Sequence, residues 1–223
     1  DARSCFPASA TVELADGTRV AVGSGRLTVG ATVRSSPGRT SDVYAWSHYT
    51  RGGVHPFVAI TTTPTDGACV AGGNATRAAT RPPLLASPGH YVYIGGRLTA
   101  ADAVAVGDVL IGGDGRPLTV TAVDRVVAAG LFNPHTLDGR LVVDGVAVSC
   151  YTRAVEPAVA AALLAPARWV YRVARAAGLV GSPGRRGGTP ARSCVLGPTA
   201  AAAGPAAARV VAVGVGALVH SRV

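Results

Sequence analysis

The sequence predicts an all-β fold followed by a helix-prone C-terminal extension, and three observations support this prediction. First, over residues 11–147 short runs of Val, Leu, Ile and Thr end at Asp-Gly, Gly-Asp, Pro-Gly or Gly-Gly pairs, which is typical of strands and turns. Second, this pattern gives way to longer Ala-rich segments after Ala154. Third, the β part contains an internal repeat. The 223 residues suffice for one large β domain with an extension.

Three segments illustrate the strand pattern. Residues 11–14 precede the Asp16-Gly17 pair, residues 109–111 precede Asp114-Gly115, and residues 118–123 form a third run. Each run either alternates between apolar and polar residues or is wholly apolar, as expected of segments in a sheet.

The repeat becomes visible when the chain is shifted by 77 positions. The shift superposes Val29-Gly30 on Val106-Gly107, Gly38-Arg39 on Gly115-Arg116, Val43 on Val120, and Ala45 on Ala122. In both copies an apolar-Val-Gly turn is followed by a strand, a Gly-Arg turn and another strand. We expect a duplicated β unit packed about a pseudo-twofold axis. Coincidence in a chain rich in Ala, Gly and Val is the alternative.

The extension is expected to be helical at residues 157–164 and 169–175. Leu164, Trp169 and Val173 would form one apolar stripe, with Arg168, Arg172 and Arg175 beside it. A flexible linker is expected over residues 182–193, where Pro, Gly and Arg gather. Residues 200–219 are interpreted first as a low-complexity tail, with a helix or a membrane-surface segment as alternatives, so membrane contact through residues 152–223 stays open.

The charge balance excludes some classes of protein. All 21 cationic residues are Arg, against 12 acidic residues, and the net charge is +9. Because the arginines are scattered and aromatic residues make up only 5%, we expect no nucleic-acid partner. No stretch of 18 apolar residues escapes interruption by Arg, Asp or Pro, so no transmembrane helix is predicted. The chain has no Met, so we expect a longer precursor upstream of Asp1.

Cysteines and histidines are few and do not form a metal-binding pattern. The cysteines are Cys5, Cys69, Cys150 and Cys194, and the histidines are His48, His55, His90, His135 and His220. Neither a CxxC pair nor an HExxH motif occurs, so no metal site and no cofactor are predicted. A site in which a His activates a nucleophilic Cys is still an alternative at this point.

Three sequence blocks carry a resemblance to a known family. The opening block Cys5-Phe6-Pro7-Ala8-Ser9-Ala10-Thr11-Val12 resembles the start of the self-processing C-terminal domain of hedgehog proteins, the Hint or Hog domain shared with inteins. Ser87-Pro88-Gly89-His90 is similar to the family's second block, which usually reads Thr-x-x-His. Residues 133–136 and 139–151 are similar to its closing block, and the order and separations agree across residues 5–151. The resemblance implies an all-β pseudo-twofold Hint fold, in agreement with the repeat.

The resemblance also implies a self-processing reaction at the Ser4-Cys5 peptide bond. Cys5 would attack the preceding carbonyl and convert the amide into a thioester, a step that needs positioning and a proton for the departing amine. His90 would supply that proton, since imidazole titrates near about 6.5. Ser87 would hold or polarise the scissile peptide. The substrate is the protein's own N-terminal segment, and water, a thiol or a lipid alcohol such as a sterol would resolve the thioester.

The sequence departs from the family at three positions. Ser87 stands where the family usually has Thr, which keeps the hydroxyl. His48 occupies the place of an Asp that, in hedgehogs, is implicated in activating the sterol nucleophile, so His48 would act as a general base and the second substrate stays open. Ser4 replaces the usual Gly before the cleavage point. Ser149-Cys150 lacks the His-Asn pair of inteins, so cleavage without splicing is expected.

The remaining candidates have weaker roles. The resemblance places Cys150 near Cys5, where it is either a redox partner or a buried small residue. Cys69 and Cys194 are interpreted as incidental thiols, and His55 and His135 as surface or structural histidines.

The predicted organisation is an upstream segment ending at residue 4, a processing domain over residues 5–151 and a tail over residues 152–223. The resemblance suggests the secretory pathway or the extracellular space, where Asn74-Ala75-Thr76 would be a glycosylation sequon. A catalytically inactive Hint scaffold or interaction module is the alternative function.

Overall fold

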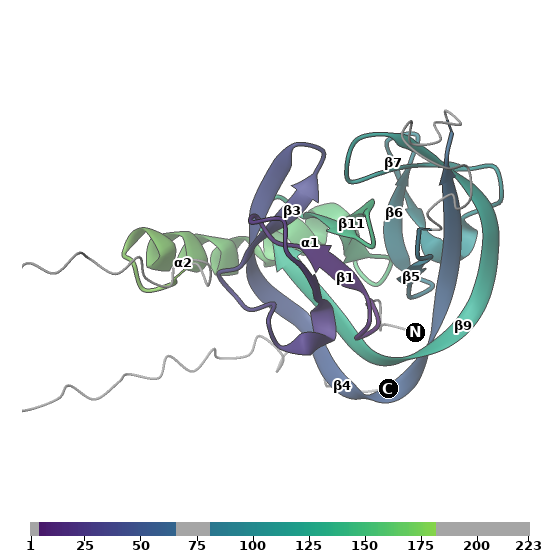
Figure 1. Cartoon of the computed structure of the whole chain (residues 1–223). Helices are drawn as coiled ribbons and strands as arrows, with labels where there is room; N and C mark the ends of the chain where they lie inside the picture. The colour runs from purple at the N-terminus through teal and green to yellow at the C-terminus, as the bar shows by residue number, and fades with distance from the viewer. Residues whose placement is uncertain (1–4, 66–80, 182–223) are drawn as a thin grey trace, which may run out of the picture. The chain divides into compact units, whose positions relative to one another are not determined.

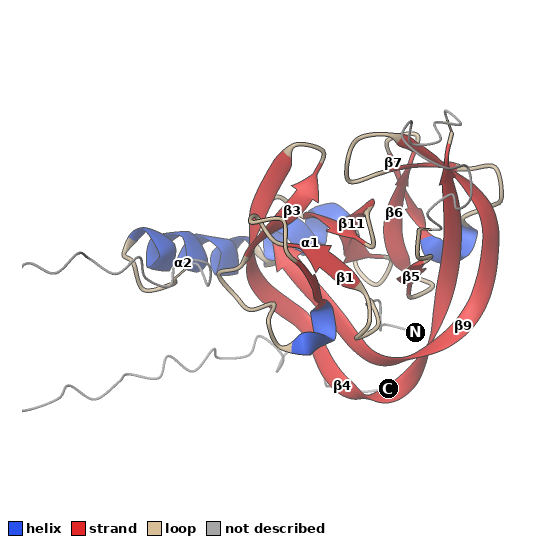
Figure 2. Cartoon of the chain, viewed as in Figure 1, coloured by secondary structure: helices blue, strands red, loops and turns tan. Residues whose placement is uncertain are grey.

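The structure, a computed structural model, describes residues 5–65 and 81–181. The strands are β1 (Thr11–Glu13), β2 (Arg19–Ala21), β3 (Thr32–Ser36), β4 (Arg39–Pro64), β5 (Leu84–Ala86), β6 (His90–Ile94), β7 (Arg97–Ala100), β8 (Val109–Ile111), β9 (Pro117–Thr136), β10 (Arg140–Val143) and β11 (Val146–Thr152). The helices are the short 3₁₀ turns η1 (Val22–Ser24) and η2 (Ala101–Ala103), followed by α1 (Pro157–Leu163) and α2 (Ala165–Ala176). The all-β prediction is confirmed, and the α-helices follow the last strand (Figure 2).

The strands form two antiparallel sheets. One sheet has the order β2-β1-β10-β11-β6-β7, and the other has the order β3-β4-β9-β8 with β5 paired to β4. The long strands β4 and β9 pair with each other over most of their length and bend together at several register shifts, as Figure 1 shows. Bulges of this kind let a long strand pair curve. The same two strands therefore contribute both to the core and to the neighbourhood of Cys5.

The repeat is present in the backbone hydrogen bonds. Gly30 N donates to Val43 O at 2.8 Å, and 77 positions later Gly107 N donates to Val120 O at 2.9 Å. Both glycines have a left-handed backbone, with φ of 94° and 95°, which side-chain-bearing residues rarely adopt. The superposed Val-Gly pairs are therefore equivalent turns, as expected of two copies of one β unit.

The two sheets enclose a core of apolar side chains drawn from both copies of the repeat. Its largest members are buried residues of β1, β4, β5, β8, β9, β10 and the segments between them: Phe6, Val12, Val22, Leu27, Ile60, Leu84, Leu110, Leu118, Phe132 and Leu141. Burial of a side chain of this size contributes about 1.5–3 kcal/mol. The core holds the opening segment of the chain against β9, because Phe6 lies in it.

The two predicted helices are present. Glu156 caps α1, since its carboxylate accepts hydrogen bonds from Ala158 N at 3.0 Å and Val159 N at 3.1 Å. Helix α2 is attached to β4 through polar contacts: the Tyr171 hydroxyl donates to Asp42 Oδ2 at 2.9 Å, and Arg175 Nε lies 3.4 Å from the same oxygen.

Several predictions concern residues outside the described ranges. These are Ser4, the sequon at Asn74, Cys69, Cys194, the linker over 182–193 and the segment 200–219. Within residues 5–65 and 81–181, no helix has the length and apolar character needed to cross a membrane.

Candidate functional site

Cys5 is fixed by the residue that follows it. Phe6 pairs with Phe132 of β9 in an antiparallel bridge, with Phe6 N donating to Phe132 O at 2.8 Å and Phe132 N donating to Phe6 O at 2.9 Å. The side chain of Phe6 is fully buried in the core. The backbone of Cys5 is therefore held at a defined position inside the domain, and Cys5 itself has no exposed surface.

Ser87 lies directly at the nitrogen of the predicted scissile bond. Cys5 N donates to Ser87 Oγ at 2.6 Å, and Ser87 N donates to Cys5 O at 2.9 Å. Both residues are buried, so water does not compete for these groups. The contact between residues 82 positions apart brings together two of the three blocks on which the family resemblance depends.

His90 follows Ser87 in one tight turn. The turn is closed by His90 N donating to Ser87 O at 2.9 Å, and its two central residues, Pro88 and Gly89, are residues that favour turns. The imidazole Nε2 lies 2.8 Å from Ser149 O of β11. A carbonyl only accepts hydrogen bonds, so Nε2 carries a hydrogen and Nδ1 is the nitrogen that gains or loses a proton.

The His90 ring lies on the same side of the fold as Cys5. It contacts the ring of Phe6, the neighbour of Cys5, with 4.2 Å between ring centroids. The imidazole is fully buried. Cys5, Ser87 and His90 thus occupy one buried region, although the sequence separates Cys5 from the other two by more than 80 residues.

The sulfur of Cys5 has an apolar environment. Cys5 clusters with Phe57 and Leu131, and the partly buried Leu85 packs against this group. Burial raises the pKa of the Cys5 thiol to about 12, because the charged thiolate would lose its hydration. The thiol is therefore protonated at neutral pH.

Asn133 connects Cys5 with His48. The bridge between Phe6 and Phe132 sets Cys5 opposite Asn133, and His48 of β4 is the register partner of Asn133 on the other side. Residues opposite one another in antiparallel strands share a face of the sheet. The three residues therefore form one row across three strand segments, with the half-buried His48 at its outer end.

The Asn133 side chain is held by several acceptors. Its Nδ2 donates to Ser47 Oγ at 2.9 Å and lies 3.4 Å from both Cys150 O and His135 Nε2. Among the described residues, Asn133 Oδ1 is buried and has no hydrogen-bond partner. Sequence reasoning did not single out Asn133, although Asn133 and His135 share one strand face by alternation.

His135 is buried beside this row. Its interpretation as a surface or structural histidine did not consider the effect of burial and neighbouring charges on its pKa. Burial, together with the nearby charges of His90, Arg168 and His48, lowers the pKa of His135 from 6.5 to about 4. The ring also lies close to the rings of Tyr44 and Tyr151, with centroid separations of 6.4 and 6.2 Å. His135 is consequently neutral at physiological pH.

Cys150 is a buried thiol on the closing strand β11. Thr136 Oγ1 lies 3.3 Å from its sulfur, and burial raises the pKa of Cys150 to about 11. Cys5 and Cys150 are both free thiols. Cys150 packs in the main core, whereas Cys5 belongs to the separate cluster with Phe57 and Leu131. A redox role for Cys150 stays a prediction.

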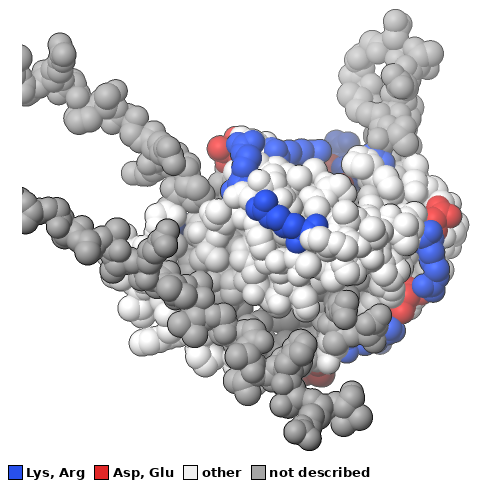
Figure 3. Space-filling view, turned by 90° about the horizontal axis from the view of Figure 1, so that it is seen from below, with Lys and Arg blue, Asp and Glu red and all other residues white. Residues whose placement is uncertain are grey.

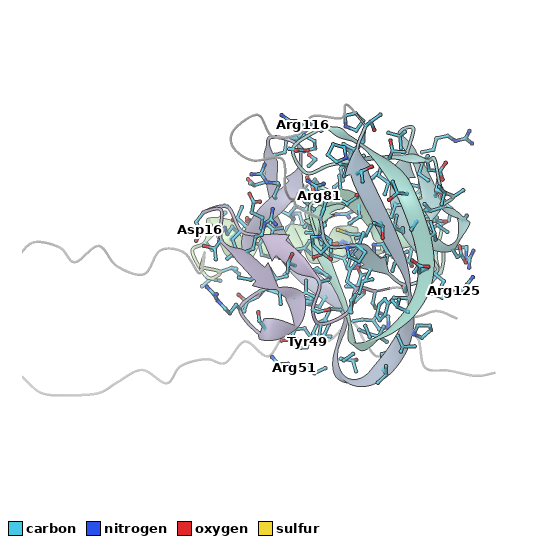
Figure 4. The ribbon with its side chains drawn as sticks, turned by 45° about the vertical axis from the view of Figure 1, so that its right-hand side comes forward. Asp16, Tyr49, Arg51, Arg81, Arg116 and Arg125 are labelled. Carbon is cyan, nitrogen blue, oxygen red and sulfur yellow. The ribbon has the colours of Figure 1, made fainter. Side chains whose placement is uncertain are left out.

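The other polar features do not gather at this site. His55 lies half-buried on β4 and, within the described residues, is not a hydrogen-bond partner of Cys5. No group of three or more Cys, His, Asp or Glu side chains within residues 5–65 and 81–181 could hold a metal ion. The labelled arginines are spread over different parts of the molecule, with Arg51 against the Tyr49 hydroxyl at 3.0 Å (Figure 4). In the view of Figure 3 acidic and basic side chains adjoin one another at the right-hand edge, and much of the rest of the face is uncharged.

Comparison with known proteins identifies the family. The model of the Hint module matches residues 1–185. The chain belongs to the Hint module family. Among solved structures, one of similar fold is a triply substituted variant of the gp41-1 intein, with a TM-score of 0.51 and 10% identity over 66% of this chain and 98% of the intein.

Two further Hint-type structures are similar. The DnaB intein from Synechocystis sp. PCC 6803 has a TM-score of 0.49 and 10% identity, covering 66% of this chain and 97% of its own. The bacterial intein-like domain from Clostridium thermocellum has a TM-score of 0.46 and 19% identity, covering 65% and 97%. No curated protein sequence matches this chain. The predicted Hint fold is confirmed, and a Hint fold suggests a capacity for self-processing.

Proposed function

We propose that this Hint domain cleaves its own precursor at the Ser4-Cys5 peptide bond through an acyl shift from nitrogen to sulfur. The observation that carries the proposal is the 2.6 Å hydrogen bond from Cys5 N to Ser87 Oγ in a region that excludes water. An inactive scaffold has no need for a buried thiol, a hydroxyl at its amide and an imidazole in the next turn. Their joint presence favours chemistry over a purely structural role.

The first step exchanges one bond for another. The Cys5 sulfur bonds to the Ser4 carbonyl carbon, and the bond from that carbon to Cys5 N breaks. The thiol proton leaves the sulfur, and the nitrogen gains a proton to become an amine, so no oxidant or reductant is needed. Ser87 Oγ already contacts this nitrogen, and its hydroxyl can pass on a proton as the nitrogen becomes pyramidal.

His90 is the proposed source of that proton. With Nε2–H held by Ser149 O, the Nδ1 side of the ring can carry the exchangeable proton. The contact between the Phe6 and His90 rings keeps the imidazole beside the residue that follows the scissile bond. The effect of this positioning is to let a weakly acidic thiol react without first forming a free thiolate, which burial disfavours.

The second step transfers the acyl group to another nucleophile. His48, at the outer end of the row through Asn133, is the proposed base that takes a proton from water, a thiol or a lipid alcohol such as a sterol. The resemblance to hedgehog proteins motivates the lipid alcohol and the secretory compartment. Release of the N-terminal segment is the product common to all three nucleophiles.

The direct test uses a precursor with a tagged segment upstream of Asp1. We expect cleavage between Ser4 and Cys5, acceleration by dithiothreitol or hydroxylamine, and no cleavage in Cys5→Ala. Mass spectrometry of the released segment distinguishes a free acid, a thiol adduct, a hydroxamate and a lipid ester. A wild-type precursor that stays intact with either nucleophile, while folded by circular dichroism, would refute the proposal in favour of the scaffold.

A second variant tests the role of His90. In His90→Ala the shift is expected to stall before the thioester, so dithiothreitol does not restore cleavage. His55→Ala serves as the control, because His55 lies on β4 and, within the described residues, is not a hydrogen-bond partner of Cys5 or Ser87. Efficient cleavage of His90→Ala by added thiol would reassign the proton to another group.

A further inference from the structure

Helix α2 is amphipathic, but the domain binds its polar side. Tyr171 is the buried residue of the helix, and its hydroxyl donates to Asp42 Oδ2. Arg175 pairs with the same carboxylate, and the Arg168 guanidinium donates to the Tyr151 hydroxyl and to Ala161 O. The helix is therefore attached to the β domain mainly through hydrogen bonds and an ion pair.

The apolar side of α2 faces away from the domain. Trp169, Val170 and Val173 are 67%, 58% and 48% exposed. Successive helical residues lie about 100° apart around the axis, so these three fall within an arc of about 100°. Tyr171 and Arg175 lie on the opposite side of the helix. Ordinary surface helices of globular proteins have the reverse arrangement, with the apolar face toward the core.

Two further exposed apolar residues flank the helix in the chain. Leu163, before α2, is 71% exposed, and Leu179, after it, is 78% exposed. An exposed apolar surface of this kind, containing a Trp, marks an interaction site when it is not scattered singly. The remaining question is which class of partner covers it.

The charge of this part of the chain selects the partner. Residues 157–223 contain eight Arg and no Asp or Glu. Arg172 is exposed at the border of the apolar face. A second copy of the chain would bring two such cationic segments together, which is unfavourable. An anionic lipid surface complements both features, because Trp and Val enter the boundary between headgroups and acyl chains while Arg contacts phosphate.

We propose that α2 docks on anionic phospholipid membranes through Trp169, Val170 and Val173, with Arg172 at the headgroups. The helix lies along the surface and does not cross the bilayer, since it has only 12 residues. The polar contacts to Asp42 fix the helix to the β domain, so docking of the helix orients the whole domain on the membrane. This proposal does not depend on the cleavage reaction.

The test measures sedimentation of the full chain with vesicles. The Cys5→Ala chain is mixed with vesicles of phosphatidylcholine plus phosphatidylserine, and with vesicles of phosphatidylcholine alone. We expect binding to the first type only and a blue shift of Trp emission. Trp169→Gln and Val173→Gln should each weaken binding about tenfold, which is the effect of leaving one such side chain out of the apolar phase.

A matched control is available on β9. Val127 is 73% exposed, comparable to Trp169, but it lies on a strand of the β domain and not on α2. Val127→Gln should therefore leave vesicle binding unchanged. Arg172→Gln should weaken binding about fivefold. Three outcomes would overturn the proposal: no binding of the parent chain to anionic vesicles, equal binding of the parent and the Trp169→Gln chain, or burial of Trp169 by self-association at the concentrations used.

Discussion

Acidification is expected to destabilise the domain through His135. The folded state holds the pKa of His135 at about 4 against the ordinary value of 6.5. Above pH 6.5 the imidazole is neutral in both states and contributes no pH dependence. As the pH falls below 6.5 the unfolded chain takes up a proton that the folded state refuses, so the free energy of unfolding decreases until the folded pKa is passed. The loss is about 2 kcal/mol at pH 5 and about 3 kcal/mol in full.

The assay is urea unfolding of the Cys5→Ala chain at pH 7.5 and at pH 5, compared with the same chain carrying His135→Gln. The glutamine retains an acceptor for the Asn133 amide but does not titrate. The difference between the two chains isolates His135 from carboxylates that also titrate, such as Asp144, whose pKa is raised by burial. An equal loss of stability in both chains would refute a buried, neutral His135.

Three further predictions concern the site. Ser87→Ala leaves the buried Cys5 N–H without its acceptor and should lower the free energy of unfolding, measured in urea, by about 1–3 kcal/mol. Ser87→Thr keeps the hydroxyl and should not lower it, so equal stability of the two variants would contradict the hydrogen bond. His48→Ala should leave thiol-induced cleavage intact and slow release without added thiol by about tenfold or more, and an unchanged rate removes His48 from the mechanism. Asn133→Ala should likewise leave thiol-induced cleavage intact and slow release without added thiol by about tenfold. Loss of thiol-induced cleavage in this variant would assign Asn133 to the first step instead.

The architecture was predictable because the signals for it are local or periodic. The turn pairs of the β part mark where strands end, and the shift of 77 residues relates Gly30 to Gly107, two turns that need a left-handed backbone. The helices were predictable for the same reason: residues 157–164 and 169–175 lack turn signals, and Glu156 and Pro157 provide an ordinary helix start. Such features are readable because each depends on a few neighbouring residues.

The cross-strand row was not predictable from the sequence. Asn133 becomes a neighbour of both Cys5 and His48 only because the register of β9 is fixed on two sides, and register depends on the whole sheet. The burial of His135 likewise depends on Tyr44 and Tyr151 from other strands. The side of α2 that faces the domain was also not predictable, because an apolar stripe at helical spacing does not reveal which side of the helix the domain binds. Long-range pairing decided each of these points.

The attachment of His90 to the last strand sets the earliest time at which the proposed cleavage can begin. The imidazole is seated by Ser149 O, and the site is incomplete until β11 has joined the sheet. From Cys5 to Thr152, the end of β11, synthesis adds 152 − 5 = 147 residues, which a ribosome working at roughly 5–20 residues per second needs about 7–30 s to make. Under the proposed cleavage at Cys5, an upstream segment would have that interval to emerge and fold before a cut could separate it, and a truncated chain that never reaches β11 is expected to keep that segment attached.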